Sequence, residues 1–202
     1  MTGQNRRRFL QSSLAAGATF AISGTKSSGN ILGANDRLRV AVAGLHGRGR
    51  SHYGAYARMK DVQVAYVVDP DSRQYSRAIS DVKNTSGTAP KPIKDVREVL
   101  DDKNLDAVSI ATPNHWHSLM SIWACQAGKD VYVEKPLSHN IFEGRKLVEA
   151  ARKYKRMVQH GTQARSSNSR ASEIAAVQSG KYGKLTVSKG YCCKPRWSIG
   201  KK

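Results

Sequence analysis

The chain has 202 residues, which is room for one complete domain and part of a second. Hydrophobic residues make up 39% of the chain, so it can bury a core, and no apolar run reaches the roughly 18 residues that span a bilayer. The formal net charge of +19 is typical of proteins that bind nucleic acid or another polyanion.

The positive charge is concentrated at the end of the chain. Residues 31–150 hold 17 Lys/Arg and 14 Asp/Glu, whereas residues 151–202 hold 13 Lys/Arg and a single acid, Glu173. The central part is therefore nearly neutral. We interpret the basic tail as one piece of a domain whose acidic residues lie further on, and we expect no nucleic-acid partner. A polyanion-binding tail is the alternative.

The first 35 residues have the pattern of an export signal and a linker. A basic front, Arg6-Arg7-Arg8-Phe9-Leu10, precedes a mild apolar stretch over residues 14–22, and paired arginines in that position resemble a twin-arginine signal. Residues 23–35 are rich in Gly and Ser, as linkers are. We expect twin-arginine (Tat) export of the folded protein to the periplasm, with no membrane span left after processing. A disordered basic N-terminus is the alternative.

Strand and helix patterns alternate between residues 36 and 160. Short apolar runs predict strands at residues 38–43, 62–68, 106–111, 131–133 and 157–160. Other stretches predict helices at residues 51–59, 71–83, 95–101, 115–127 and 141–154, and residues 84–92 are rich in turn formers. The alternation predicts an α/β domain, a Rossmann-type parallel sheet with helices on both faces. Ligands of such sheets bind beyond the carboxyl ends of the strands.

A glycine turn follows the first predicted strand and resembles the dinucleotide template G-x-G-x-x-G. It reads Gly44-Leu45-His46-Gly47-Arg48-Gly49, with His46 where the template has its second glycine. The helix after it offers free N–H groups to a pyrophosphate. Asp69 ends the second strand, 20 residues beyond Gly49, where an acid accepts hydrogen bonds from the adenosine ribose. This acid favours NAD, and NADP stays open because Arg73 is near; a turn without a ligand is the alternative.

Metal and disulfide sites are not expected. Cys192 and Cys193 are adjacent, which suits neither a zinc site nor an unstrained disulfide between them, and Cys125 stands alone. His115 and His117 are two residues apart and do not share a helix face, so a metal pair there is the weaker interpretation.

Two further runs follow later strands. Thr112-Pro113-Asn114-His115-Trp116-His117 comes after one strand, and Glu134-Lys135-Pro136 comes after the next. Together with the glycine turn, these runs resemble the Gfo/Idh/MocA oxidoreductases, the family of glucose–fructose oxidoreductase and inositol dehydrogenase, over about residues 36–202. The resemblance implies an NAD(P)-dependent enzyme that transfers a hydride to or from a hydroxyl carbon of a sugar or cyclitol.

The resemblance also implies roles for individual residues. Lys135 is the candidate catalytic residue, since it would hydrogen-bond the substrate hydroxyl, and a cation there stabilises developing alkoxide charge. A solvated surface lysine is the alternative. The candidate cofactor-binding residues are Gly44, His46, Gly47, Arg48, Gly49, Asp69, Thr112, Pro113, Asn114, His117 and Glu134.

Residues 161–202 resemble the start of the family's second domain. They are expected to form a connecting helix at residues 169–179 and the first strand of an incomplete α+β domain at residues 185–191. In the family, an Asp/His acid–base pair and the surface for homo-oligomer assembly belong to later parts of that domain. We therefore expect this chain to be a poor catalyst, and a dinucleotide-binding fragment without chemistry is the alternative.

Overall fold

The computed structural model describes residues 37–191. The predicted export signal and linker lie outside the described residues, as do Cys192 and Cys193. The chain divides into two units, with the boundary between Gly161 and Thr162. No helix among the described residues is long and apolar enough to cross a bilayer.

The first unit contains a sheet of six parallel strands. The strand order is β3-β2-β1-β4-β5-β6, with the two halves of the sheet meeting between β1 and β4. The predicted Rossmann-type α/β fold is therefore confirmed. The strands are β1 Leu38–Ala43, β2 Val62–Val68, β3 Lys91–Ile93, β4 Ala107–Ile110, β5 Asp130–Glu134 and β6 Val158–Gly161.

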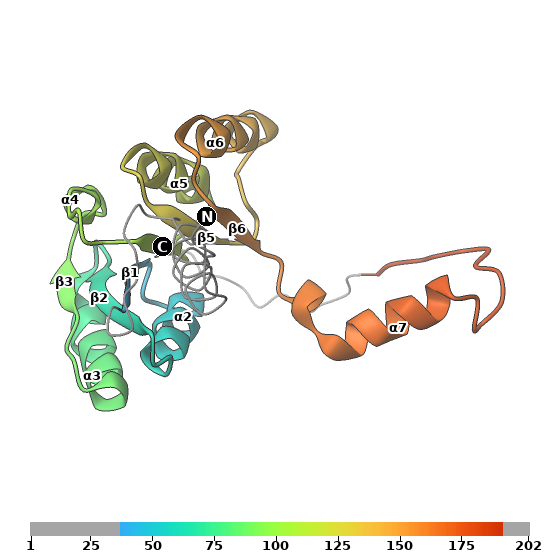
Figure 1. Ribbon diagram of the computed structural model, residues 1–202, viewed down its shortest axis with the longest axis horizontal. Coiled ribbons are helices and arrows are strands. Elements are labelled where there is room, and N and C mark those ends of the chain that lie inside the picture. Colours follow the sequence, from blue (N-terminus) through green and yellow to red (C-terminus); the bar gives the residue numbers. More distant parts are fainter. Residues whose placement is uncertain (1–36, 192–202) are drawn as a thin grey trace, which may run out of the picture. The chain divides into compact units, whose positions relative to one another are not determined.

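Helices cover both faces of this sheet. Helices α2 (Arg48–Ala57) and α3 (Tyr75–Ser86) lie on one face, and α4 (Arg97–Leu100), α5 (His117–Gln126) and α6 (Ile141–Tyr154) lie on the other (Figure 1). Successive residues of a strand point to opposite faces. In β1, Val40 and Val42 accordingly join the core under α2 and α3, while Ala41 and Ala43 join the core on the opposite face.

Several elements of the first unit differ from the sequence prediction in their bounds, and strand β3 is an addition to it. Helix α2 begins at Arg48 and not at residue 51, because the glycine turn itself supplies its N-cap, Gly47. Strand β3 lies within the predicted loop; it is a short edge strand containing Pro92, and an edge tolerates a residue without an N–H. The predicted helix at residues 115–127 starts as a 3₁₀ turn, Asn114–Trp116, before α5.

The core also holds the one cysteine among the described residues. Cys125 lies on α5 and is fully buried. Burial raises the pKa of its thiol to about 11, so the thiol is protonated and unreactive at neutral pH.

The second unit contains one longer helix among its described residues. Helix α7 (Asn168–Gln178) follows a 3₁₀ turn, Ala164–Ser166, and lies within one residue of the predicted helix at 169–179. The predicted strand at residues 185–191 is wrong for the described chain, because residues 183–191 form no regular secondary structure. A strand needs a partner for its backbone N–H and C=O groups, and the described residues of this unit provide none.

Candidate functional site

The glycine turn lies where the two halves of the sheet meet. It follows β1, and the loop that follows β4 lies beside it. A Cβ atom on Gly44 would lie 2.7 Å from the carbonyl carbon of Ala111, and one on Gly49 would lie 1.6 Å from the Gly44 carbonyl oxygen. Only glycine fits these contacts, which bring the start of α2 against the carboxyl ends of β1 and β4. This is the crevice where α/β sheets bind ligands.

The N-terminus of α2 is left without a side-chain cap. Gly47 is its N-cap, no side-chain hydrogen bond caps it, and its first turn contains no acid. Helix α6 differs, because Asn140 caps it by accepting from the Glu143 N–H at 2.9 Å. The free N–H groups and the positive dipole end of α2 suit an anionic ligand such as a phosphate group.

Asp69 closes β2 on the other side of the turn. Its side chain is only 9% exposed, and its two carboxylate oxygens accept from the Leu45 N–H at 2.8 Å and the Asp71 N–H at 2.9 Å. A carboxylate has about four acceptor positions, so acceptor capacity remains for ligand hydroxyl groups. Arg73 pairs with Asp71 at 2.8 Å and holds the pKa of that carboxyl well below its usual range.

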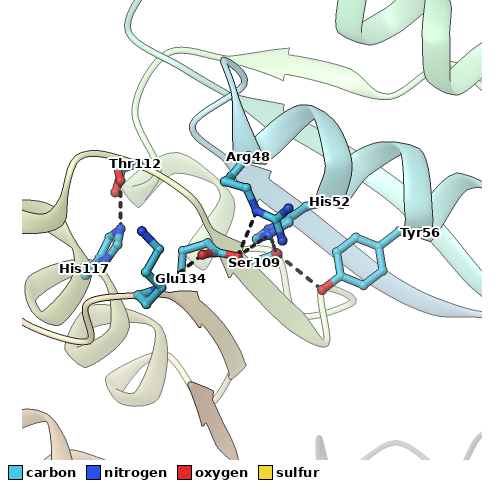
Figure 2. A network of polar contacts seen from close by, with 8 residues as sticks. Arg48, His52, Tyr56, Ser109, Thr112, His117 and Glu134 are labelled. Carbon is cyan, nitrogen blue, oxygen red and sulfur yellow. Dashed lines mark hydrogen bonds and ion pairs between the residues drawn. The ribbon is translucent and has the colours of Figure 1, made fainter. Parts of the chain in front are cut away.

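Polar side chains on one face of α2 form hydrogen bonds with residues of the sheet. Arg48, His52 and Tyr56 are spaced four residues apart and therefore lie along one side of the helix. Figure 2 shows this row directed at Glu134 and Ser109. Glu134 Oε1 lies 3.3 Å from Arg48 Nε and 3.1 Å from His52 Nε2. Ser109 Oγ lies 2.9 Å from His52 Nδ1 and 3.4 Å from the Tyr56 hydroxyl.

Glu134 is a buried carboxylate at the carboxyl end of β5. It is 3% exposed, and besides Arg48 and His52 it accepts from the Lys135 backbone N–H at 3.3 Å. Burial lowers the pKa of His52, although the adjacent Glu134 carboxylate acts in the opposite direction. The network therefore connects the N-terminal end of α2 to the segment that carries Lys135.

The loops after β4 and β5 are joined by His117. This side chain is 2% exposed, and its Nε2 atom lies 2.8 Å from the Thr112 carbonyl oxygen (Figure 2). Its Nδ1 atom lies 2.6 Å from the Pro136 carbonyl oxygen. Pro113, Asn114 and the Lys135 side chain are exposed beside these loops. The Lys135 amine is thus free to meet a ligand at this edge of the sheet.

Two hollows border the glycine turn. A pocket of about 370 Å³ opens over the ends of β1 and β2 and is lined mainly by Val68, Pro70, Arg97, Thr112, Trp116 and Trp123. A second hollow of about 290 Å³ lies on the α2–α3 side, where the exposed His46 side chain borders it together with Arg50 and Arg77. His46 therefore borders this second hollow and is absent from the lining of the first.

The structure brings most predicted site residues to one edge of the sheet. The glycine turn, Asp69 and Thr112 follow β1, β2 and β4, and Glu134 is the last residue of β5. The sequence analysis did not single out His52, Trp116 or Trp123 as site residues. The spacing of four residues between Arg48 and His52 is a signal that would have found His52. The 370 Å³ pocket lined by Trp116 and Trp123 has no comparable signal in the sequence, because residues of the loop between β3 and α4 also line it.

The fold, the glycine turn and the acid at the end of β2 define a dinucleotide-binding α/β protein. The chain matches a family model described as an oxidoreductase family with an NAD-binding Rossmann fold, Gfo/Idh/MocA, over residues 38–162. The chain therefore belongs to the Gfo/Idh/MocA family, and the resemblance seen in the sequence is confirmed over residues 38–162.

Solved structures and curated proteins give similar results. Myo-inositol 2-dehydrogenase from Lactobacillus plantarum is 27% identical, with a TM-score of 0.65 over 74% of this chain and 43% of that chain. Scyllo-inositol dehydrogenase from Lactobacillus casei with bound NAD(H) and scyllo-inositol has a TM-score of 0.65 at 21% identity over 73% of this chain and 43% of that chain, a likeness of fold alone. Glycosyl hydrolase family 109 protein 1 from Shewanella sp. (strain MR-4) is 26% identical over 169 residues.

The chain spans less than half the length of these proteins. It covers 43% of each of the two inositol dehydrogenases and 36% of the glycosyl hydrolase family 109 protein.

Proposed function

We propose that this chain forms the cofactor-binding part of an NAD-dependent oxidoreductase that transfers a hydride to or from a hydroxyl carbon of a sugar or cyclitol. The observation that carries the proposal is the close-packed, uncapped glycine turn beside the Asp69 carboxylate. The turn suits the pyrophosphate, and the remaining acceptor capacity of Asp69 suits the two ribose hydroxyls. The myo-inositol 2-dehydrogenase that is 27% identical supports the substrate class.

The two ends of the cofactor would then occupy opposite halves of the crevice. The pocket between Pro70 and Trp116 is mainly apolar and lies beyond Asp69, so it suits the adenine ring. The nicotinamide would lie toward Glu134 and Lys135, at the end of β5. When bound, NAD supplies the hydride acceptor. The exposed Lys135 amine would hydrogen-bond the substrate hydroxyl and stabilise negative charge on its oxygen.

The remaining parts of the proposal concern the whole protein. We propose residues 1–35 as a twin-arginine signal and linker, residues 36–160 as the NAD(P)-binding domain, and residues 161–202 as the start of a substrate and oligomerisation domain. Periplasmic location follows from the proposed signal, and homo-oligomer assembly follows from the family resemblance.

A second candidate function comes from the curated relatives. Their names describe glycosyl hydrolases, and some glycosidases use NAD in place of the usual carboxylate pair. The same cofactor site would serve either reaction. In the complete protein, a dehydrogenase forms NADH in proportion to the substrate consumed, whereas an NAD-dependent glycosidase releases sugar without accumulating NADH.

The dinucleotide proposal is tested by calorimetric titration of the chain with NAD and NADP. We expect saturable binding of NAD and weaker binding of NADP, because the Asp69 carboxylate repels a 2′-phosphate. The variant Asp69→Ser removes that repulsion and should reduce the preference for NAD by about tenfold or more. The quantity to compare is the ratio of the dissociation constants for NADP and NAD. General damage to the turn would weaken the binding of both cofactors alike and leave this ratio unchanged.

The exposed carboxylate of Asp61 provides the matched control. It lies before β2, and Asp61→Ser should leave the preference for NAD unchanged. Absence of binding by either dinucleotide to a folded chain would contradict the proposal.

A further inference from the structure

The polar row on α2 contains a buried histidine that contacts a carboxylate at the ligand-binding edge of the sheet. His52 is 7% exposed, and its two ring nitrogens lie 2.9 Å from Ser109 Oγ and 3.1 Å from Glu134 Oε1. Ser109 and Glu134 are themselves 2% and 3% exposed. Because both ring nitrogens are used inside the protein, His52 can act on a ligand only through the groups that it holds.

The chemistry of these groups sets the direction of their hydrogen bonds. A carboxylate only accepts, so His52 donates its Nε2–H to Glu134. Burial lowers the pKa of His52, and a neutral ring avoids the cost of a further buried charge. The Nδ1 atom of that ring accepts from the Ser109 hydroxyl, whose oxygen accepts from the Tyr56 hydroxyl at 3.4 Å. The donors therefore point in one direction, from Tyr56 to Glu134.

Arg48 also contacts Glu134 from α2, but it is far more exposed than His52. Its Nε atom lies 3.3 Å from Glu134 Oε1, and its side chain is 51% exposed. Arg48 is the first residue of α2, so a phosphate bound at the N-terminus of this helix could draw its guanidinium group away. The buried His52 can hold Glu134 whether or not a ligand occupies that end.

The orientation of Glu134 affects the segment that follows β5. Its Oε2 atom accepts from the Lys135 backbone N–H at 3.3 Å, so the carboxylate orientation and the backbone at Lys135 depend on each other. The His52 ring is in turn packed against Tyr132 of β5 in a T-shaped arrangement, with ring centroids 5.3 Å apart. Packing and hydrogen bonds together restrict the ring, and a restricted donor fixes the geometry of the group that it contacts.

We propose that His52 is a positioning residue for the nicotinamide end of the dinucleotide site. It holds the Glu134 carboxylate, and through it the Lys135 segment, in the orientation that binds NAD. The inference rests on the proposed function, which puts the nicotinamide beside Glu134 and Lys135. The structural alternative is a polar group that only supports the packing of α2 on the sheet. The two roles differ in which part of the cofactor loses affinity when His52 is replaced.

The test compares the binding of NAD and ADP to the complete 202-residue chain by calorimetry. ADP carries the adenosine and both phosphates but lacks the nicotinamide riboside, the part that would reach the segment after β5. His52→Asn keeps an acceptor for Ser109 but is too short to reach Glu134. We expect it to bind NAD about tenfold more weakly and ADP within about twofold of the wild type. His52→Gln keeps a donor at the level of Nε2 and should retain NAD affinity within about threefold.

Ser109→Ala tests the other hydrogen bond of the ring with a smaller change. It leaves Nδ1 without its donor and should weaken NAD binding about threefold, again with little effect on ADP. Ser121→Ala is the matched control, because Ser121 is also fully buried and donates to a backbone carbonyl, that of His117, at 2.6 Å. This control should leave the ratio of the dissociation constants for ADP and NAD unchanged.

The outcomes separate the inference from the proposed function. Parallel losses of NAD and ADP affinity in His52→Asn and Ser109→Ala would show a purely structural role and overturn the inference. Equal NAD affinities of His52→Asn and His52→Gln would overturn it too, because only the glutamine can reach Glu134. If His52→Asn does not fold, Ser109→Ala decides the question alone. A wild-type chain that binds neither nucleotide would contradict the proposed function, and the inference would fail with it.

Discussion

Gly49 and Gly54 lie on the same helix but meet different surroundings. A Cβ atom on Gly49 would overlap the Gly44 carbonyl oxygen, whereas one on Gly54 would meet only the end of the Arg58 side chain at 3.9 Å. We expect Gly49→Ala to destabilise the protein by about 3 kcal/mol or more, because the backbone of the turn must move. Gly54→Ala should stabilise it by about 0.5–1 kcal/mol through helix propensity. Chemical denaturation measures both values, and equal effects would contradict the close packing of the turn.

We expect His52 to make the stability of the protein depend on pH. Burial places its folded-state pKa below the ordinary value of 6.5, so at mildly acidic pH the unfolded chain binds more protons than the folded protein. The contribution of His52 to stability is therefore present above about pH 6.5 and is lost as the pH falls. We expect the free energy of unfolding to decrease more between about pH 7.5 and about pH 5.5 in the wild type than in His52→Gln.

The comparison of the two proteins isolates this histidine from the other titrating groups. Equal decreases in the wild type and in His52→Gln would contradict a neutral His52 in the folded state.

The site residues differ in how far the sequence predicted them. Gly44, Gly49 and Asp69 could be predicted from the sequence because their roles depend on a fixed spacing along strand, turn and helix. The contact between His117 and Pro136 joins two loops 19 residues apart, and no local pattern specifies a bond of that kind. The hydrogen bonds of His52 to Ser109 and Glu134 likewise depend on which strands lie side by side under α2.

At the scale of elements, helices α2 and α6 begin differently, and we assign the N-terminus of α6 a structural role alone. Asn140 and Glu143 cap α6 reciprocally, with Asn140 Nδ2 lying 2.8 Å from Glu143 Oε1, whereas α2 has no such cap. We expect Asn140→Ala to destabilise the protein by about 1 kcal/mol without changing NAD affinity. The same substitution at the exposed Asn84, inside α3, should be neutral or slightly stabilising. Thermal unfolding checks the two signs, and a weaker NAD affinity in Asn140→Ala would contradict this division of roles.

Elements with strong periodicity were predicted well, and short elements were not. Helix α6 has the predicted bounds, residues 141–154, because its apolar side repeats over several turns. Strand β3 has only three residues and includes Pro92, so its pairing with β2 comes from the sheet and not from its own sequence. The strand predicted at residues 185–191 has the right apolar residues but lacks a partner strand among the described residues.

At the scale of the whole molecule, the proposed site and most of the basic tail belong to different units. The candidate site residues, from Gly44 to Lys135, lie in the first unit, while residues 162–202 carry nine of the 34 Lys/Arg. We expect deletion of residues 162–202 to leave the dissociation constant for NAD within about twofold of that of the full chain. Calorimetry checks this value.

The same deletion tests the alternative role of the tail. Salt-sensitive DNA binding by the full chain that disappears in the deletion variant would support a polyanion binder. Loss of NAD binding on deletion would contradict the assignment of the site to the first unit.

The most direct test of the account is a titration of the ¹⁵N-labelled chain with NADH, followed by amide NMR signals. The account predicts that the amide signals of Leu45, Gly47 and Arg48 shift together with that of Asp69 and saturate with one dissociation constant. Saturating NADH that shifts none of these four signals, or shifts only signals of residues 162–191, would contradict the proposed dinucleotide site.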